Sequence, residues 1–358
     1  MADKKIIDVA ALTEAAKQYD PILRTLPFFS LEACAAALGL NIQEVENEHV
    51  VVNRRRQAGS TGPYKAGMTI TYQEEIAKFF ESNLKPELVV SKTKDNITNY
   101  KEKKVLVAAG TPLDLKAKVH PLQQMIVEDE VKSHAEDVVF SLFFAERNED
   151  VFSPATAFTG FFPAMDMLVT EGFISSDLGN LQVTGAFAEP ASDTDYLAYE
   201  HLVDFVGSAH PLLRSSIGGK PQLLITQTVL KAARNAYRKK LRMFDYPTLQ
   251  QLLESIREDA FCPELVFSTH EALGTGSKLT LQKMGNMDLG FNTGKSNQFM
   301  QVRNIFEDPN EVQFWIEAAY GVRIRDVHAK VFKTNEQTNV GLDLAGDYVK
   351  AVVPPVGG

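Results

Sequence analysis

Several short segments of the sequence contain residue types that could do chemistry. Residues 274–278 read GTGSK, which has the glycines of a phosphate-binding loop but neither the Walker spacing nor a preceding apolar strand. His134 lies two residues before Glu136, and His270 directly precedes Glu271, but neither histidine has the second histidine at i+4 that a zinc-protease helix needs. We therefore interpret the glycine segment as a surface loop and both histidines as exposed.

The nucleophilic side chains give no catalytic pattern either. Ser208, in GSAHP, is not in a nucleophile-elbow sequence and has no triad order around it, so we interpret it as the end of a helix. Cys34 and Cys262 are the only cysteines, and they lie far apart without metal-ligand spacing. The sequence therefore predicts a protein that is not an enzyme and binds no cofactor or metal. Two unpaired cysteines also indicate a reducing compartment.

The composition is that of a soluble, well-cored chain. Of the 358 residues, 44% are hydrophobic and 23% charged, which is ordinary for a globular protein. The net charge of -9 argues against a general nucleic-acid coat, because binding to phosphates depends on clustered Lys and Arg, so any contact with DNA is expected to be local. The charged N-terminus does not resemble a secretory signal, and no apolar run could span a bilayer, so we expect a cytoplasmic protein without membrane contact.

The first third of the chain predicts two short helices and a long hairpin. Helical spacing links Leu12 to Tyr19, and residues 31–40 form a second apolar stretch after Pro27. Residues 50–117 alternate β-branched and polar residues around a glycine-rich tip, which indicates extended strands, with a short helix near residues 76–80. Because a two-stranded ribbon is marginal in isolation, such an arm suggests a neighbouring subunit.

A long helix is expected next, over residues 120–147. This stretch has no glycine, begins at Pro121, and repeats apolar residues every three or four positions. At 1.5 Å per residue it would extend roughly 40 Å, which is long for a globular protein. We interpret it as a structural spine.

The remainder alternates helices and strands. We expect a helix capped by Ser192 or Asp193 and ending near Gly207, with Leu197 on its buried side. A strand over residues 223–226 then precedes a helix with Leu241 facing inward. Further elements follow in order: the helix TLQQLLESIRED, the strand ELVFSTH, a polar loop over residues 274–294, alternating strands from VQFWIEAAYG onward with Trp315 in the core, and a flexible C-terminal VPPVGG.

Two basic runs were considered as binding surfaces. The run from Arg238 to Arg242 follows one helix and is interpreted as a solvated face. The run Arg54, Arg55 and Arg56 lies at the root of the hairpin arm and has nothing in its own fold to pair with, so we predict intersubunit contacts there.

The order of these elements resembles the Hong Kong 97-type major capsid protein of tailed double-stranded DNA phages, an α+β fold. The similarity is greatest over residues 314–332, where an aromatic residue, alanines and a Tyr-Gly-Val step lead into the last strand, and it extends to the helix-to-strand passage 195–242. The resemblance implies an N-arm over residues 1–48, an E-loop over 49–117, a peripheral domain with the spine helix over 118–220, an axial domain over 221–322, and a return to the peripheral domain with a C-terminal tail over 323–358.

The same resemblance implies the partners. Copies of the chain would form hexamers and pentamers of an icosahedral shell in the virion, assembled in the host cytoplasm around double-stranded DNA. Scaffolding, portal, decoration and maturation-protease proteins would be the other partners. Lys65 near the hairpin tip, together with Gly274 and Gly276 in a loop at the capsomer centre, are further intersubunit candidates. The lysine-to-asparagine crosslink of some relatives is not carried over, because no matching asparagine or glutamate is identified.

Two other functions stay open on the sequence. An encapsulin-like shell has the same fold but encloses cargo enzymes instead of DNA, and encapsulin chains are typically shorter with a smaller arm. A cytoplasmic α/β enzyme, with residues 50–117 as a lid, would need a pocket with perturbed ionisable groups, for which the sequence has no motif.

Overall fold

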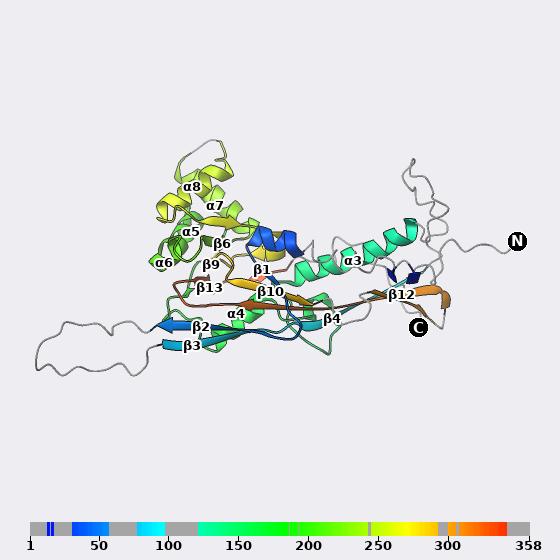
Figure 1. Ribbon diagram of the computed structural model, residues 1–358. Coiled ribbons are helices and arrows are strands. Elements are labelled where there is room, and N and C mark those ends of the chain that lie inside the picture. Colours follow the sequence, from blue (N-terminus) through cyan, green and yellow to red (C-terminus); the bar gives the residue numbers. More distant parts are fainter. Residues whose placement is uncertain are drawn as a thin grey trace, which may run out of the picture.

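The protein is an elongated body with a lobe on one side and a projecting ribbon at one end (Figure 1). The computed structural model describes the following residues: 13–14, 16–17, 31–56, 77–96, 121–185, 187–192, 194–242, 245–292, 300–305 and 308–341. Of these, residues 53–56, 77–80, 95–96, 121–125, 304–305 and 308–310 are described in their backbone only. Lys65 and the C-terminal VPPVGG lie outside the described residues.

A long sheet forms the body. Its central strand is β12 (Asp308–Ile324), which pairs antiparallel with β4 (Glu87–Asn96) on one side and with β10 (Met287–Asn292) and β11 (Met300–Ile305) on the other. The short β1 (Asn41–Glu44) adds to β10 in parallel. Over residues 311–318 alternate β12 side chains are buried, as the period of two in the sequence predicts, whereas residues 318–321 are all buried.

The spine helix is shorter than the sequence predicts. Helix α3 covers Pro121–Ser141, so the helix is confirmed but its extension to residue 147 is wrong. The chain turns back, because the N–H groups of Phe161 and Phe162 at the start of α4 (Phe161–Thr170) donate to the carbonyls of Leu142 and Phe143, at 3.1 and 3.0 Å. The aromatic run that suggested more helix instead packs at this reversal, with the Phe143 and Phe161 rings 5.2 Å apart.

The lobe is a second, mixed sheet covered by helices. Its strands, in spatial order, are β5 (Leu181–Gln182), β13 (Phe332–Asn335), β9 (Thr280–Lys283), β6 (Pro221–Leu224) and β7 (Val266–Ser268). Its helices are α5 (Leu197–Gly207), α6 (Pro211–Arg214), α7 (Gln227–Lys240) and α8 (Leu249–Asp259). The Thr226 side chain caps α7, and Thr248 forms a capping box with Gln251 at α8, so the expected helices begin at sequence-encoded signals.

Smaller elements complete the fold. The ribbon consists of β2 (His49–Arg56) and β3 (Ala77–Leu84), which pair with each other over their full length. The 3₁₀ turns η1 (Pro154–Thr156) and η2 (Glu271–Leu273) shape two loops, and β8 (Thr275–Gly276) pairs with β14 (Asn339–Val340). Residues 31–38 are helical, as the sequence predicts.

Two hydrophobic cores divide the molecule differently from the expected domain boundaries. Helix α5, expected in the peripheral domain, packs in the same core as α7 and α8. Strands β10 and β12, expected in the axial domain, share the core of α3. Segments distant in sequence alternate between the two cores, so the body and the lobe are both discontinuous.

Several local expectations are wrong. Residues 274–294 were expected to form a polar loop, but β9 and β10 there are buried strands, because their Lys, Gln and Asp side chains find hydrogen-bond partners inside. Residues 77–80 are strand, not helix, because they pair with β2. Trp315 is only half-buried, on the β12 face opposite to Phe314, where Lys92 Nζ lies 4.0 Å from its ring.

Three positions on the helices also differ. Tyr196 is the N-cap of α5, and the Asp195 carboxylate accepts from the Leu197 N–H, so the helix begins later than a cap at residue 192 or 193 implies. Leu197 is exposed in this first turn, and Leu241, at the C-cap of α7, is exposed as well.

Within the described part of the chain, no helix is long and apolar enough to cross a membrane.

Candidate functional site at the root of the ribbon

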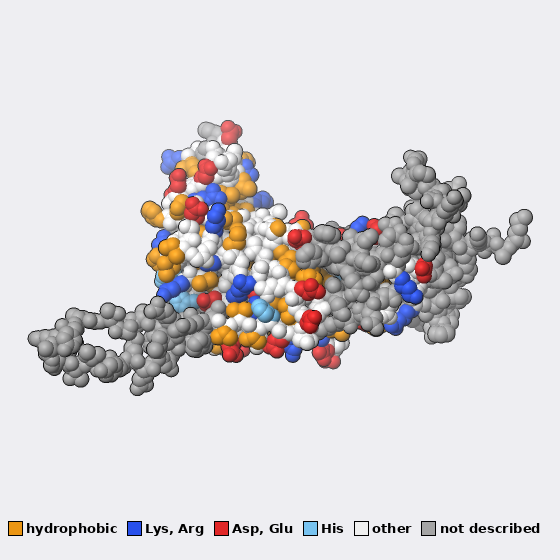
Figure 2. Space-filling model, in the orientation of Figure 1, with side chains coloured by type: hydrophobic (Ala, Val, Ile, Leu, Met, Phe, Trp, Pro, Cys, Tyr) orange, Lys and Arg blue, Asp and Glu red, His pale blue; other side chains and the backbone are white. Residues whose placement is uncertain are grey.

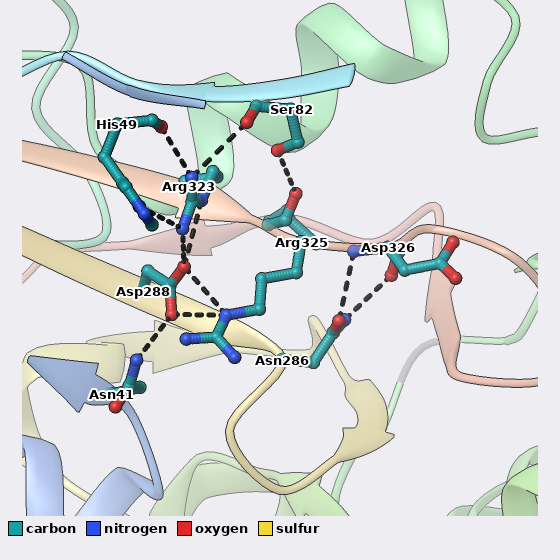
Figure 3. Close-up of polar contacts among 9 residues, drawn as sticks. Asn41, His49, Ser82, Asn286, Asp288, Arg323, Arg325 and Asp326 are labelled. Atoms are coloured by element: carbon teal, nitrogen blue, oxygen red, sulfur yellow. Dashed lines mark hydrogen bonds and ion pairs between the residues drawn. The ribbon is translucent and has the colours of Figure 1, made fainter. Parts of the chain in front are cut away.

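Three neighbouring strands place polar side chains in a single row. Asn41 of β1 and Arg323 of β12 are the cross-strand partners of Asp288 in β10. Asn41 Nδ2 donates to Asp288 Oδ1 at 3.0 Å, and Arg323 Nε donates to Asp288 Oδ2 at 2.9 Å. Arg325 Nε donates to both carboxylate oxygens, at 2.7 and 2.8 Å (Figure 3). Asp288 is fully buried, yet three side chains satisfy it.

Arg323 connects this row to the ribbon. Its Nη1 donates to the His49 carbonyl of β2 at 2.7 Å and to the Ser82 carbonyl of β3 at 3.3 Å. Its Nη2 lies 3.4 Å from His49 Nδ1, which acts as the acceptor because a guanidinium has no lone pair to offer. Ser82 Oγ donates to the Ile324 carbonyl at 2.9 Å. Both strands of the ribbon are therefore attached to the end of β12.

Two glycines let the ribbon root lie close to the sheet. Gly290 and Gly321 are cross-strand partners in β10 and β12. A Cβ atom on Gly321 would lie 2.8 Å from the Lys85 carbonyl oxygen, and one on Gly290 would lie 3.0 Å from the Leu84 side chain. Leu84 is fully buried in this hollow. Gly321 lacks a side chain because the Lys85 backbone lies against it, and Gly290 because the Leu84 side chain packs on it.

The electrostatics of the cluster favour a fixed geometry. Asp288 and Arg323 have side chains that are 0% and 1% exposed, whereas Arg325 is 35% exposed and reaches solvent. A buried ion pair of this kind adds little net stability over an apolar pair, but breaking it leaves an uncompensated charge. The five donors of Arg323 also fix direction, since a guanidinium fork is planar and rigid. We interpret the cluster as the clamp that sets the direction of the ribbon.

Other buried ionisable groups have structural partners. Burial lowers the pKa of Lys333 to about 8, and its Nζ donates to the Phe205 carbonyl and to Ser208 Oγ, both at 2.9 Å, at the end of α5. Burial lowers the pKa of His134 to about 4, and its Nε2 lies 3.1 Å from the Tyr320 hydroxyl. His134 is therefore in the core, which corrects the expectation that it is exposed. Among the described residues, no group of three or more His, Cys, Asp or Glu could hold a metal ion.

The predicted intersubunit residues that the structure describes lie in separate elements. Arg54, Arg55 and Arg56 lie at the outer end of β2 and not at the root of the arm, because the strand already begins at His49; only their backbone is described. Gly274 and Gly276 pack against β14 of the same chain, where added Cβ atoms would lie 2.2 Å from the Val340 carbonyl oxygen and 2.5 Å from Asn339 Oδ1. Both glycines therefore allow a close contact within the chain itself, for which a larger side chain would have no space.

Sequence reasoning missed the cluster around Asp288. Asp288 stands between Met287 and Leu289, and Arg323 between Val322 and Ile324, so each charged residue interrupts an apolar strand. A charge at such a position is a usable signal, because buried charges are almost always paired. The signal does not show which residue pairs with each charge, because the pairing follows from the strand register.

The comparisons with known proteins bear on the fold. No family model matches the chain, and no curated protein matches its sequence. Among solved structures, a satellite phage P4 procapsid including the size determination (Sid) protein matches with a TM-score of 0.51 and 10% identity, over 86% of this chain and 89% of that one. The capsid of Myoviridae phage XM1 matches with a TM-score of 0.50 and 10% identity, over 85% and 91%.

These matches identify the fold class: the chain has the α+β fold of phage capsid subunits. The elongated sheet, the spine helix along it, the projecting ribbon and the side lobe are the parts of that fold. More narrowly, it is the Hong Kong 97-type fold that the element order of the sequence predicts.

Proposed function

We propose that this chain is the major capsid subunit of a tailed phage and assembles with copies of itself into a closed icosahedral shell around double-stranded DNA. The observation that carries the proposal is the coverage of the fold, since more than four-fifths of the chain aligns with capsid subunits from two phage shells. A structural role, not catalysis, fits the buried ionisable groups, whose partners cap helices or clamp strands.

The finer assignments are parts of the same proposal. Hexamers and pentamers would be the units of the shell, scaffolding and portal proteins its assembly partners, and the host cytoplasm the place of assembly. The N-arm, E-loop, peripheral and axial domains are proposed in the same chain order, with α5 in the axial domain and β10 and β12 in the peripheral domain, because the two cores group these elements in this way. Arg54, Arg55, Arg56, Lys65, Gly274 and Gly276 are proposed as intersubunit contacts.

The shape of the molecule supports self-association. The β2–β3 ribbon extends from the body with partners only at its root, among the residues that the structure describes. Two strands without a covering layer are marginal in water, so a ribbon of this length needs a surface to lie on. Val50 and Val52 on β2 are about half exposed, at 47% and 52%, which gives such a surface something apolar to cover.

Expression of the full chain, alone and with its neighbouring genes, tests the proposal by electron microscopy and light scattering. We expect closed shells, tubes or isolated rings of subunits. A monomer or dimer under every condition would contradict the proposal and would favour the enzyme alternative. Protein cargo instead of DNA inside the shells would favour an encapsulin-like compartment.

A further inference from the structure

Helix α7 of the lobe carries a concentration of positive charge (Figure 1). Its sequence, QTVLKAARNAYRKK, contains five Lys or Arg residues and no Asp or Glu, although the whole chain has a net charge of -9. Arg242, just after the C-cap of the helix, is exposed and adds a further cation. The helix dipole favours cations in the last turn, but Arg234 lies six residues before the last residue of α7, beyond the reach of that effect.

The three lysines of α7 have partners in the chain itself. Lys231 Nζ pairs with Glu189 Oε1 at 2.7 Å, and Lys240 Nζ lies 3.9 Å from Asp259 Oδ2. Lys239 Nζ donates to the carbonyls of residues 190 and 192, at 3.3 and 2.7 Å. The lysines therefore hold the neighbouring segments of the lobe against the helix.

The arginines are different, because none of them pairs with a carboxylate among the residues that the structure describes. Arg234 Nε donates to the Pro247 carbonyl at 2.7 Å, which leaves the two Nη groups for another acceptor. Arg234 and Arg238 are four residues apart, so they share one face of the helix. Both guanidinium groups lie over the ring of Tyr246, with their central carbons 5.7 and 4.2 Å from its centroid.

Tyr246 makes this face a prepared surface. Its side chain is 57% exposed, and a guanidinium that stacks on an aromatic ring still has its N–H donors free in the plane of the group. The planar fork of arginine matches the oxygens of a phosphate in pairs. Because stacking on Tyr246 already restrains Arg238, less conformational entropy is lost when a phosphate binds.

We propose that Arg234, Arg238 and Arg242 bind the phosphate backbone of the packaged double-stranded DNA, with the Tyr246 ring holding the first two arginines in place. Contacts to phosphates carry no sequence information, so they suit a protein that encloses DNA of any sequence. The contact is local, since the rest of the chain is acidic. This inference rests on the proposed function, and it requires that α7 lies on the inner surface of the shell.

The salt dependence of DNA binding tests the contact. The probe is a short labelled DNA duplex, titrated with the unassembled full-length chain and followed by fluorescence anisotropy. Each phosphate contact contributes about −0.9 to the slope of the logarithm of the binding constant against the logarithm of the salt concentration. Three arginines predict a slope of about −2.7, so binding should weaken about fortyfold between about 50 and 200 mM salt.

A charge-matched pair of variants makes the test specific. Arg238→Gln combined with Arg242→Gln should bring the slope to about −0.9 and weaken binding about tenfold or more at low salt. Lys85→Gln combined with Lys330→Gln is the control, because it removes the same charge from exposed positions of the body and should leave the slope unchanged. Circular dichroism checks that all variants fold.

The aromatic ring is tested separately. Tyr246→Leu removes no charge, so it should weaken binding several-fold while the slope stays that of the parent. A steeper loss of slope than in the parent would show that the ring does not act by positioning the arginines.

The failure of this contact is distinguishable from the failure of the shell. If the chain forms shells but the double arginine variant keeps the slope of the parent, or if α7 lies on the outer surface of DNA-filled shells, the contact is overturned and the shell proposal stands. An acidic polypeptide that binds the chain at least as tightly as the duplex would also overturn it, because the row would then be a protein-binding surface. A chain that binds DNA through the row but never assembles would overturn the shell proposal alone.

Discussion

Replacing Asp288 by Asn should destabilise the chain strongly. The substitution keeps the side-chain volume but removes the negative charge opposite Arg323, whose side chain is 1% exposed. Breaking a buried pair by removing one partner costs about 3–5 kcal/mol, and we assign that cost to Arg323 because Arg325 reaches solvent. With a urea m-value of about 3 kcal/mol/M, the midpoint of unfolding should fall by roughly 1–2 M.

A second variant separates the buried charge from the clamp. Replacing Asp288 by Leu and Arg323 by Met together removes both charges, so the free energy of unfolding should recover to within about 1–2 kcal/mol of the parent. The carbonyls of His49 and Ser82 then lose their donor, so amide hydrogen exchange should become faster in the ribbon root than in the lobe.

Urea unfolding of the unassembled chain, followed by circular dichroism, measures the first effect, and mass-resolved hydrogen exchange measures the second. Asp129→Asn is the control, since a solvated acid on α3 should change the free energy of unfolding by less than about 0.5 kcal/mol. The reasoning is refuted if Asp288→Asn costs less than about 1 kcal/mol, or if the double variant is no more stable than the single one.

Three further predictions concern stability. Gly321→Ala should cost about 1–3 kcal/mol by thermal unfolding, because its Cβ would lie 2.8 Å from the Lys85 carbonyl oxygen; an unchanged midpoint would contradict the close approach. Phe261→Gly should stabilise the unassembled chain by about 1 kcal/mol, because Phe261 has a φ of 52°, which favours glycine, and is 81% exposed just after α8. This end of α8 belongs to the lobe, whose surface carries apolar side chains (Figure 2). A lower midpoint of thermal unfolding would contradict the prediction. His134 has a folded pKa of about 4, below its ordinary 6.5, so the unfolded chain binds more protons in that window and stability should fall as pH drops from 6.5 toward 4. Asp137, with its pKa raised to about 6, changes stability with pH in the opposite direction. The test is therefore a comparison: His134→Gln should lose less stability than the parent between pH 6.5 and pH 4.

Sequence periodicity predicted the elements whose signals are local. Helix α7 begins at Thr226 and shows an apolar stripe at helical spacing, so one segment contains all the information for it. The extent of α3 could not be predicted in the same way. Phe143 suits a helix as well as a turn. The chain leaves the helix after Ser141 because the next two carbonyls, of Leu142 and Phe143, accept from the start of α4, about twenty residues later.

The buried strands β9 and β10 show a different limit. The two strands and the turn between them contain Lys283, Asn286 and Asp288 beside glycines, a composition typical of loops. Lys283 is nevertheless buried, because its Nζ donates to the Gly219 carbonyl at 3.0 Å, and Asn286 Nδ2 donates to the Asp326 carbonyl at 2.8 Å. Partners that are forty or more residues distant turned apparent loop residues into core residues.

Two aspartates of the fold differ in what their surroundings supply. Asp288 looked like a loop residue until the strand register placed it beside Asn41, Arg323 and Arg325, which all donate to its carboxylate. Asp137 is in the opposite position, because it is half-buried and the described chain supplies no cation for it. A half-buried carboxylate that gains no cation loses hydration without compensation, and this loss raises the pKa of Asp137. Whether a carboxylate of this fold is satisfied therefore depends on the strand register, which the local sequence does not contain.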